Sequence, residues 1–296
     1  MKTRILVMVV CVLAVTNFTS AETIRGIDID FVTIGNAGNA ADTQIMDNDL
    51  TSGYGSVVYN YRIGKYEITN AQWKAFTDVT GAPTGTPSDA YDQSTFSTGT
   101  QQPTSGISWY EAAQFCNYLT SGDKSLGAYQ FGTDGSITVD RSSAVSAYVM
   151  VYVIPTENEW YKAAYFKHDG SGYSLFANGT DTLPTAGIDS KYLEDPIIGS
   201  PWNIDSGTQE QNGTFNMMGN VWEWNETLID SYRGVRGGSY ASSTGINGLY
   251  SSNRSADIPS NEGSIGDMGF RIAEIPEPAT LILLTLGGMV LRRFGR

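Results

Sequence analysis

All the strong helix signals of this chain lie before residue 166. Three segments place a hydroxyl three residues before a Glu or Gln and then continue as amphipathic stretches, starting at Thr69, Ser108 and Thr156. From Lys167 onwards helical periodicity is absent, and Gly, Asn, Ser and Asp dominate. Long irregular stretches are uncommon inside a domain unless they carry function. The sequence therefore predicts a loop-rich α+β domain with small helices and a short antiparallel sheet.

Two strand signals precede the helices, at Ile27 to Ile34 and at Val57 to Ile63. Both are clusters of β-branched and aromatic residues between Gly and Asn turns. Between the two ends of the chain, no linker, repeat or charge block divides the sequence. We therefore expect a single domain over residues 22–275, which is long enough to bury a core.

The N-terminal segment has the features of a secretory signal peptide. Lys2 and Arg4 precede an apolar run from Ile5 to Val15, and small residues follow up to Ala21. The alternative is a membrane anchor, but a spanning helix needs about 20 apolar residues. The sequence predicts a leader over residues 1–21 that is cut after Ala21, and hence an exported protein.

The C-terminal segment, residues 276–296, resembles the PEP-CTERM sorting signal of Gram-negative bacteria. It consists of Pro276-Glu277-Pro278, an apolar run from Ala279 to Leu291, and three terminal arginines that hold this end on the cytoplasmic side. The resemblance implies an exosortase-type partner enzyme and delivery to the cell surface or the exopolysaccharide matrix. Membrane contact is expected only through this segment. A simple tail anchor is the alternative, and it too leaves the domain outside the cell.

Charge and residue counts exclude several functions. The chain has 31 acidic and 18 basic residues, a formal charge of −13, which argues against a nucleic-acid partner. Its single histidine, His168, lies in a polar loop, which argues strongly against a Ser-His-Asp triad or a multi-His metal site. Its two cysteines, Cys11 and Cys116, cannot supply a disulfide framework.

Six segments, in order along residues 30–273, resemble the formylglycine-generating enzyme (sulfatase-modifying factor) family. The most specific is the block Gly-Asn-Val-Trp-Glu-Trp that ends at Trp224. The resemblance implies a C-type-lectin-like fold. The six segments are Arg62–Trp73, Ile107–Cys116, Ile154–Trp160, Asn216–Trp224, Arg236–Tyr240 and Gly269–Ala273.

The resemblance also implies a Ca²⁺ site. In the family, this block binds Ca²⁺ through two side chains and two backbone carbonyls, and oxygen ligands are those that Ca²⁺ prefers. The matching positions here are Asn216, Gly219, Val221 and Glu223. The alternative is that Asn216 and Glu223 only satisfy backbone groups of the loop. A second Ca²⁺ site of the family has no clear counterpart in this sequence.

The catalytic chemistry of the family is not expected here. Family oxidases bind copper through two cysteines that follow the Arg-Gly-Gly-Ser block, and hydroxyls cannot replace soft thiolate ligands of Cu(I). In this chain Ser242 stands at the first of these positions, and the second falls near Tyr250 and Ser251. No cysteine follows Cys116, which we expect to be a small apolar residue of a helix. We therefore expect no bound copper and no catalytic residue of the oxidase type.

Substrate contacts are the remaining family feature. Ser239 and Trp222 match positions that line the peptide-binding groove of the family. We therefore expect an exported, Ca²⁺-binding module that binds peptide or glycan, or has a structural role, without catalysis. Two alternatives stay open: a formylglycine-generating oxidase-type enzyme, and a pseudoenzyme that docks sulfatases.

Overall fold

The computed structural model describes residues 21–83, 96–133, 136–192, 199–241, 245–262 and 266–275. The predicted leader, apart from Ala21, and the predicted sorting segment 276–296 lie outside these ranges. Within the ranges, no helix has the length and apolar content needed to cross a membrane.

The three predicted capping boxes are confirmed as helix starts. Thr69, Ser108 and Thr156 each accept a hydrogen bond from the backbone three residues on, and the Gln or Glu there bonds back to the cap. A short fourth helix, which the sequence analysis missed, starts after the capping residue Asp140. The helices are α1 (Asn70–Thr80), α2 (Trp109–Ser121), α3 (Arg141–Ala147), α4 (Glu157–Tyr165) and the 3₁₀ turn η1 (Gly245–Leu249).

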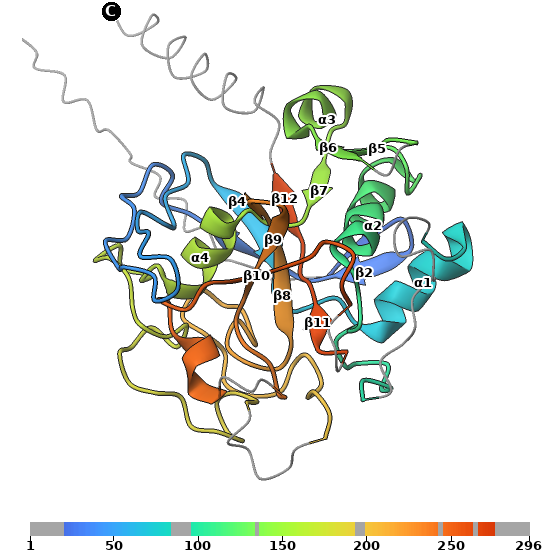
Figure 1. Cartoon of the computed structure of the whole chain (residues 1–296). Helices are drawn as coiled ribbons and strands as arrows, with labels where there is room; N and C mark the ends of the chain where they lie inside the picture. Colours follow the sequence, from blue (N-terminus) through green and yellow to red (C-terminus); the bar gives the residue numbers. More distant parts are fainter. Residues whose placement is uncertain are drawn as a thin grey trace, which may run out of the picture.

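Regular structure in the rest of the described chain consists of short strands in four small sheets (Figure 1). The sequence predicted one short antiparallel sheet, whereas there are four sheets in the described residues and β11 runs parallel to β8. The strands are β1 (Glu22–Ile24), β2 (Ile27–Ile29), β3 (Phe31–Ile34), β4 (Tyr61–Gly64), β5 (Tyr129–Phe131), β6 (Ile137–Val139), β7 (Val151–Val153), β8 (Trp222–Ile229), β9 (Tyr232–Arg236), β10 (Ser255–Asp257), β11 (Met268–Gly269) and β12 (Ala273–Ile275).

The first of the two four-stranded sheets joins the ends of the domain in the order β3-β4-β12-β7. Ala273 of β12 pairs with Ile63 of β4 on one side and with Val153 of β7 on the other. The predicted strand at 27–34 is in fact two strands, because β2 pairs with β1 in a separate hairpin while β3 pairs with β4. The predicted strand at 57–63 begins only at Tyr61, since the Val57 carbonyl instead accepts a hydrogen bond from Gly38.

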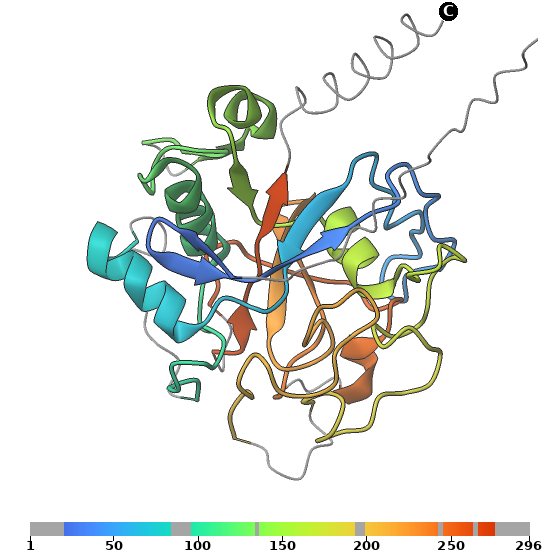
Figure 2. The ribbon, with the colours of Figure 1, turned by 180° about the vertical axis from the view of Figure 1, so that it is seen from behind.

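The second four-stranded sheet, in the order β10-β9-β8-β11, contains the Trp-Glu-Trp start of β8. Strands β8 and β9 form an antiparallel hairpin whose register shifts between Trp224 and Leu228. Figure 2 shows the β1–β2 hairpin and β4 passing over the opposite side of the molecule.

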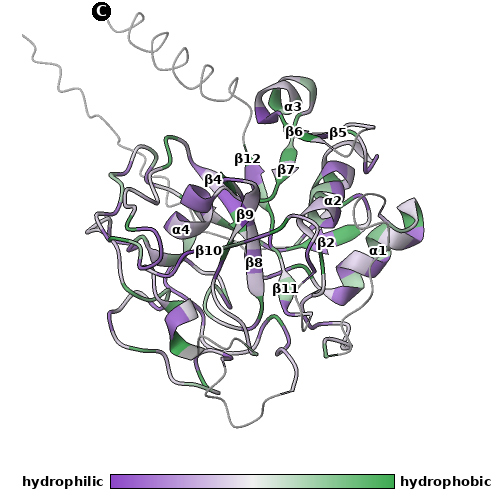
Figure 3. Ribbon diagram, in the orientation of Figure 1, coloured by the Kyte–Doolittle hydropathy of each residue, from purple (hydrophilic) through white to green (hydrophobic). Residues whose placement is uncertain are grey.

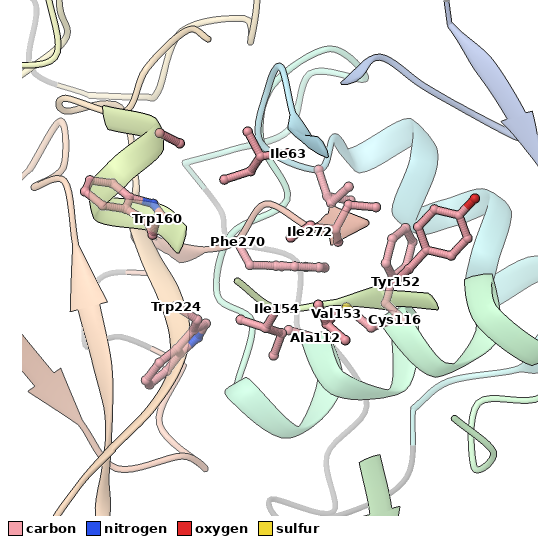
Figure 4. Packing of buried hydrophobic residues seen from close by; sticks show 14 of the residues in the cluster. Ile63, Ala112, Cys116, Tyr152, Val153, Ile154, Trp160, Trp224, Phe270 and Ile272 are labelled. Atoms are coloured by element: carbon pink, nitrogen blue, oxygen red, sulfur yellow. The ribbon is translucent and has the colours of Figure 1, made fainter. Parts of the chain in front are cut away.

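One continuous cluster of buried apolar side chains reaches from Ile27 to Ile275. Figure 4 shows Phe270 near its centre, with Trp160 and Trp224 to one side and Cys116 and Tyr152 to the other. The three residues of β7 are buried, and Figure 3 shows green on this strand. This core holds α2, α4 and the start of β8 against one another, and so fixes the positions of the predicted site residues.

Candidate functional site

The segment that leads into β8 curls through left-handed backbone. Asn216, Gly219 and Asn220 have φ values of 57°, 79° and 59°. Gly and Asn are the residues that adopt this conformation most readily. Position 219 also has no room for a side chain, because an added Cβ would lie 2.1 Å from the Lys191 carbonyl oxygen. This turn directs the Asn216 and Asn220 side chains inward.

The two asparagines meet a buried carboxyl group, Glu67. The Asn220 Nδ2 donates to Glu67 Oε1 at 2.8 Å, and the Asn216 Nδ2 lies 3.4 Å from Glu67 Oε2. The Asn216 Nδ2 also donates to the Ile204 carbonyl at 3.0 Å. Glu67 was not predicted from the sequence as a site residue. The available signal was an acidic residue directly before Ile68, in a segment that otherwise matches the family.

Glu223, the predicted acidic Ca²⁺ ligand, is fully buried at the start of β8. Its two carboxylate oxygens accept hydrogen bonds from Arg271, from Nε at 2.6 Å and from Nη2 at 2.5 Å. The Trp160 Nε1 donates to the same carboxylate at 2.7 Å. Arg271 also donates to the carbonyls of Gly64 and Phe215. One carboxylate thus organises β8, α4 and the segment after β11.

Acidic groups outnumber basic ones in this interior. Glu67, Glu210 and Glu223 are all buried around the single guanidinium of Arg271. Burial raises the pKa of Glu67 to about 8 and the pKa of Glu210 to about 7, against the opposing effect of Arg271. A surplus of buried carboxyl groups requires either bound protons or a cation.

The donor chemistry of the predicted Ca²⁺ residues is oxygen throughout, which fits a hard cation. Asn216 offers an amide oxygen after rotation of its side chain, Gly219 and Val221 offer carbonyls, and Glu223 offers a carboxylate that it shares with Arg271. Within the described ranges, no three His, Cys, Asp or Glu side chains converge as metal ligands. A cation here would therefore depend mainly on amide and carbonyl oxygens.

A second group of residues, which we call the Trp222 face, lies beside this interior. It consists of Trp222, Ser239, Tyr240 and Asp267. Trp222 is partly exposed, and its backbone N–H donates to the Asp267 carbonyl. Ser239 is fully buried, and its Oγ donates to Asp267 Oδ2 at 2.5 Å. Trp222 can thus contact a ligand directly, whereas the buried Ser239 fixes the position of the Asp267 side chain through its hydrogen bond.

Two polar groups of the Trp222 face are poorly compensated. The Tyr240 hydroxyl is buried and makes no hydrogen bond within the described residues. Burial raises the pKa of Tyr240 to about 12 and raises the pKa of Asp267 above its usual range. A buried hydroxyl without a partner costs about 1–3 kcal/mol, so a ligand or water that bonds to it would be stabilised. Neither Tyr240 nor Asp267 was selected from the sequence.

Of the two positions at which the family has cysteines, the structure describes only the second. Ser242 lies outside the described residues, and Ser251 is buried with its carbonyl accepting from Arg236. Cys116 is fully buried in α2, where burial raises the pKa of its thiol well above the usual value. His168 is exposed in the loop after α4.

Comparison with known proteins gives relatives of the same fold. The chain is 24% identical over 254 residues to the chaperone protein LppX of Paenibacillus barcinonensis, which covers 76% of this chain and 82% of that protein. The solved structure of Treponema denticola variable protein 1 superposes with a TM-score of 0.58 at 20% identity, over 88% of this chain and 99% of that one. The structure of PvdO from Pseudomonas aeruginosa superposes with a TM-score of 0.58 at 15% identity, over 86% and 98% of the two chains.

The family follows from a match to the sulfatase-modifying factor enzyme 1-like domain over residues 31–275. The predicted α+β fold of the formylglycine-generating-enzyme type is confirmed by this match, by the small helices and short sheets, and by the structural relatives. The chain belongs to the sulfatase-modifying factor enzyme 1-like domain family.

Proposed function

We propose that this domain is a non-catalytic module that binds an extended polypeptide segment at the Trp222 face. The observation that carries the proposal is the combination of a partly exposed indole with the unpaired Tyr240 hydroxyl and the buried Asp267 carboxyl. An aromatic ring supplies contact area, and the polar groups can bond to a peptide backbone.

The absence of a thiol pair from the sequence supports binding without oxidation. The chain has two cysteines; Cys11 belongs to the predicted leader and Cys116 is buried in α2. Copper chemistry of the family type needs two thiolates at one site, and hydroxyls do not bind Cu(I) in their place. The name of the LppX relative, a chaperone protein, also agrees with a role in binding polypeptide.

The place of action that we propose is outside the cell. The leader signal over residues 1–21 and the resemblance of residues 276–296 to a sorting signal support export and processing by an exosortase-type enzyme. The domain would then act at the cell surface or in the exopolysaccharide matrix.

A peptide-binding experiment tests the role of the Trp222 face. A fluorescently labelled sulfatase-motif peptide containing cysteine, and a scrambled version, are titrated with the purified protein and followed by anisotropy. We expect binding to wild type that Trp222→Ala weakens about tenfold, the loss typical of an aromatic hot spot. Trp202→Ala is the matched control, because Trp202 is another partly exposed indole, packed near Lys191.

Each outcome bears on the proposal. Equal loss in both tryptophan variants, or equal binding of the scrambled peptide, would argue against a specific site at Trp222. The enzymatic alternative is tested by incubating the peptide with the protein and copper and then analysing the peptide by mass spectrometry. Conversion of its cysteine to formylglycine would replace the binding proposal with the oxidase one, whereas retention without conversion supports a docking module.

We further propose that one Ca²⁺ ion binds through Asn216, Gly219, Val221 and Glu223. The surplus of buried carboxyl groups around Arg271 supports a cation, as does the all-oxygen donor set. Bound Ca²⁺ would raise the stability of the folded state by mass action. It would act as a structural ion that fixes the turn before β8, and through it the Trp222 face.

Thermal unfolding in Ca²⁺, in Mg²⁺ and in EGTA tests this ion. We expect Ca²⁺ but not Mg²⁺ to raise the Tm of wild type. Asn216→Gly keeps a residue suited to positive φ while removing the amide, and it should abolish the Ca²⁺-dependent rise. Asn36→Gly is the matched control, since Asn36 also has a positive φ (55°) and lies elsewhere. Equal Tm in Ca²⁺ and EGTA would refute the site.

A further inference from the structure

A second candidate binding site, which shares no residue with the Trp222 face, is a cavity of about 630 Å³ between two loops. Its walls are residues 36–43 on one side and Phe166 with residues 170–173 on the other. Figures 1 and 2 both show the first of these loops beside α4, which leads into the second. The volume lies within the range of small-ligand sites, about 300–1,000 Å³.

Asp42 is the charged residue of this cavity, and the other described residues of its walls are uncharged. The Asp42 Oδ2 accepts a hydrogen bond from the Tyr161 hydroxyl at 2.7 Å, and Oδ1 accepts from the Gln44 N–H at 3.1 Å. Both donors are neutral, so they orient the carboxylate without compensating its charge. A carboxylate has about four acceptor positions, so each oxygen can accept one more hydrogen bond. The cavity therefore presents a negative charge that is held in place and can bind a cation.

An aromatic ring, Tyr173, lies beside this carboxylate. Burial and, after it, the charge of Asp42 raise the pKa of the Tyr173 hydroxyl. That hydroxyl accepts from the Asn39 Nδ2 at 2.7 Å and donates to the Ala40 carbonyl at 2.9 Å, which fixes the ring. The ring also packs against Phe166, with centroids 5.2 Å apart and planes at 68°. The face of an aromatic ring attracts cations, so ring and carboxylate favour the same charge.

One positive charge, Lys162, lies behind the cavity wall and not in the cavity. Lys162 is fully buried in α4 and does not line the cavity. Its Nζ donates to the Asn36 carbonyl at 2.9 Å and lies 5.8 Å from the centre of the Phe166 ring. Burial alone lowers the pKa of this amine, to about 8, and no carboxylate opposes that effect. Lys162 therefore does not neutralise Asp42, and we expect a ligand cation at Tyr173 and not at Phe166.

The uncharged side chains of the walls indicate what carries the cation. Asn36, Thr43 and Ser171 are exposed and present amide and hydroxyl groups. A Cβ at Gly38 or Gly170 would meet nothing within 4 Å, so the two loops leave room for a ring. Amides and hydroxyls beside an aromatic ring suit the alternating apolar and hydroxyl faces of a sugar. A lysine side chain has only methylene groups before its ammonium, and it would leave these groups without partners.

We propose that this cavity binds an amino sugar, with its ammonium on the Asp42 carboxylate and its ring against Tyr173. The ammonium donates to the acceptor positions that Tyr161 and Gln44 leave free, in charge-assisted hydrogen bonds. The site does not depend on peptide binding at the Trp222 face. Because the chain as a whole is strongly acidic, cations are attracted to much of its surface, and the contacts with the sugar ring supply the selectivity.

Calorimetric titration of the protein with triglucosamine tests the proposal, at pH 5.5, where the amines of this sugar are protonated. Tri-N-acetylglucosamine is the uncharged sugar of the same length, and trilysine is a cation of the same net charge that is not a sugar. We expect triglucosamine to bind at least about tenfold more tightly than either, the size of one charge-assisted contact. Equal binding of tri-N-acetylglucosamine would overturn the role of the charge. Equal binding of trilysine would overturn the sugar in favour of a cationic peptide.

Three variants locate the binding. Asp42→Asn keeps the shape of the side chain without its charge, and should weaken triglucosamine binding about tenfold. Tyr173→Leu removes the aromatic ring, and should weaken binding about threefold. Ser171→Trp places a large ring on the exposed cavity wall, and should block binding without entering the core.

Asp205→Asn is the matched control, because Asp205 is an exposed aspartate that does not line the cavity. It should bind triglucosamine as wild type does, and thermal unfolding verifies that each variant is folded. Wild-type affinity in Asp42→Asn or Ser171→Trp, an equal loss in Asp205→Asn, or no binding to wild type would refute the site.

Discussion

Arg271 and Glu223 form a two-point ion pair in the centre of the domain, and neither side chain has any solvent exposure. Removing one partner leaves the other charged and buried, which typically costs about 3–5 kcal/mol. We therefore expect Arg271→Met and Glu223→Gln each to lower the free energy of unfolding by about that amount. Urea unfolding in EGTA measures it without a contribution from cations.

Two comparisons test whether the loss comes from the buried ion pair: the double variant, and a variant in an exposed ion pair. Glu223→Gln with Arg271→Met should lose less than the sum of the single changes, because neither member of this pair is left charged without the other. Lys74→Met breaks the exposed ion pair with Asp78 and should cost less than about 1 kcal/mol. Single-variant losses as small as that of Lys74→Met would contradict a structural role for the buried pair.

The capping box at Thr69 gives a second prediction. The Thr69 Oγ1 accepts from the Gln72 N–H at 3.1 Å, and the Thr69 N–H donates to Gln72 Oε1 at 2.8 Å. Thr69→Ala should destabilise the protein by about 1 kcal/mol, the usual cost of a lost cap. Thr77→Ala, on the same helix, should not lower the free energy of unfolding, because alanine is at least as favourable as threonine in a helix interior. Urea unfolding measures the stability of both variants. Equal free energies of unfolding would mean that the Thr69 cap does not stabilise the protein.

Two glycines allow the cost of left-handed backbone to be measured apart from the cost of a steric clash. Gly219 and Gly38 have nearly the same φ, 79° and 78°, but an added Cβ has open space at Gly38 and meets the Lys191 carbonyl at 2.1 Å at Gly219. Gly38→Ala should cost about 1–2 kcal/mol from the left-handed backbone alone. Gly219→Ala should cost several times more or prevent folding. Comparable stability in circular-dichroism melts would show that the turn before β8 can move away from Lys191.

The helix starts could be predicted from sequence because a capping box is a contact between residues three apart. The strands could not be placed to the same accuracy. They are two to eight residues long, and their partners are remote: Ala273 pairs with Ile63, and Met268 pairs with Trp222. A strand of three residues carries too little periodicity to fix its ends, so its limits depend on the partner strand.

The candidate site was predictable to the same limited degree. The resemblance selected Asn216, Glu223 and Trp222, which lie in one short segment. It did not select Glu67, Asp267 or Lys162, because what distinguishes them is their neighbours in space. The Ser239 hydroxyl bonds to Asp267, 28 positions away, and Lys162 bonds to Asn36, 126 positions away. Contacts of this range have no local sequence pattern.

The buried amine of Lys162 predicts a pH dependence of stability. Burial lowers its pKa to about 8 in the folded chain, against an ordinary value of 10.5. Between these pH values the unfolded chain binds a proton that the folded chain does not, so this residue makes stability rise with pH. Below about pH 8 both states are protonated, and the folded state carries the full cost of the buried charge. Lys162→Met removes that cost.

We therefore expect Lys162→Met to be more stable than wild type at pH 7, with a difference that shrinks as the pH rises from about 8 towards 10.5. Urea unfolding of both proteins at pH 7, 8, 9 and 10 measures this difference in the free energy of unfolding. Because the tyrosines titrate in both proteins, their contribution cancels in the difference. For Lys74→Met, which removes an exposed amine, the difference should stay nearly constant. A constant difference for Lys162→Met as well would mean that an anion already compensates the amine in the free protein.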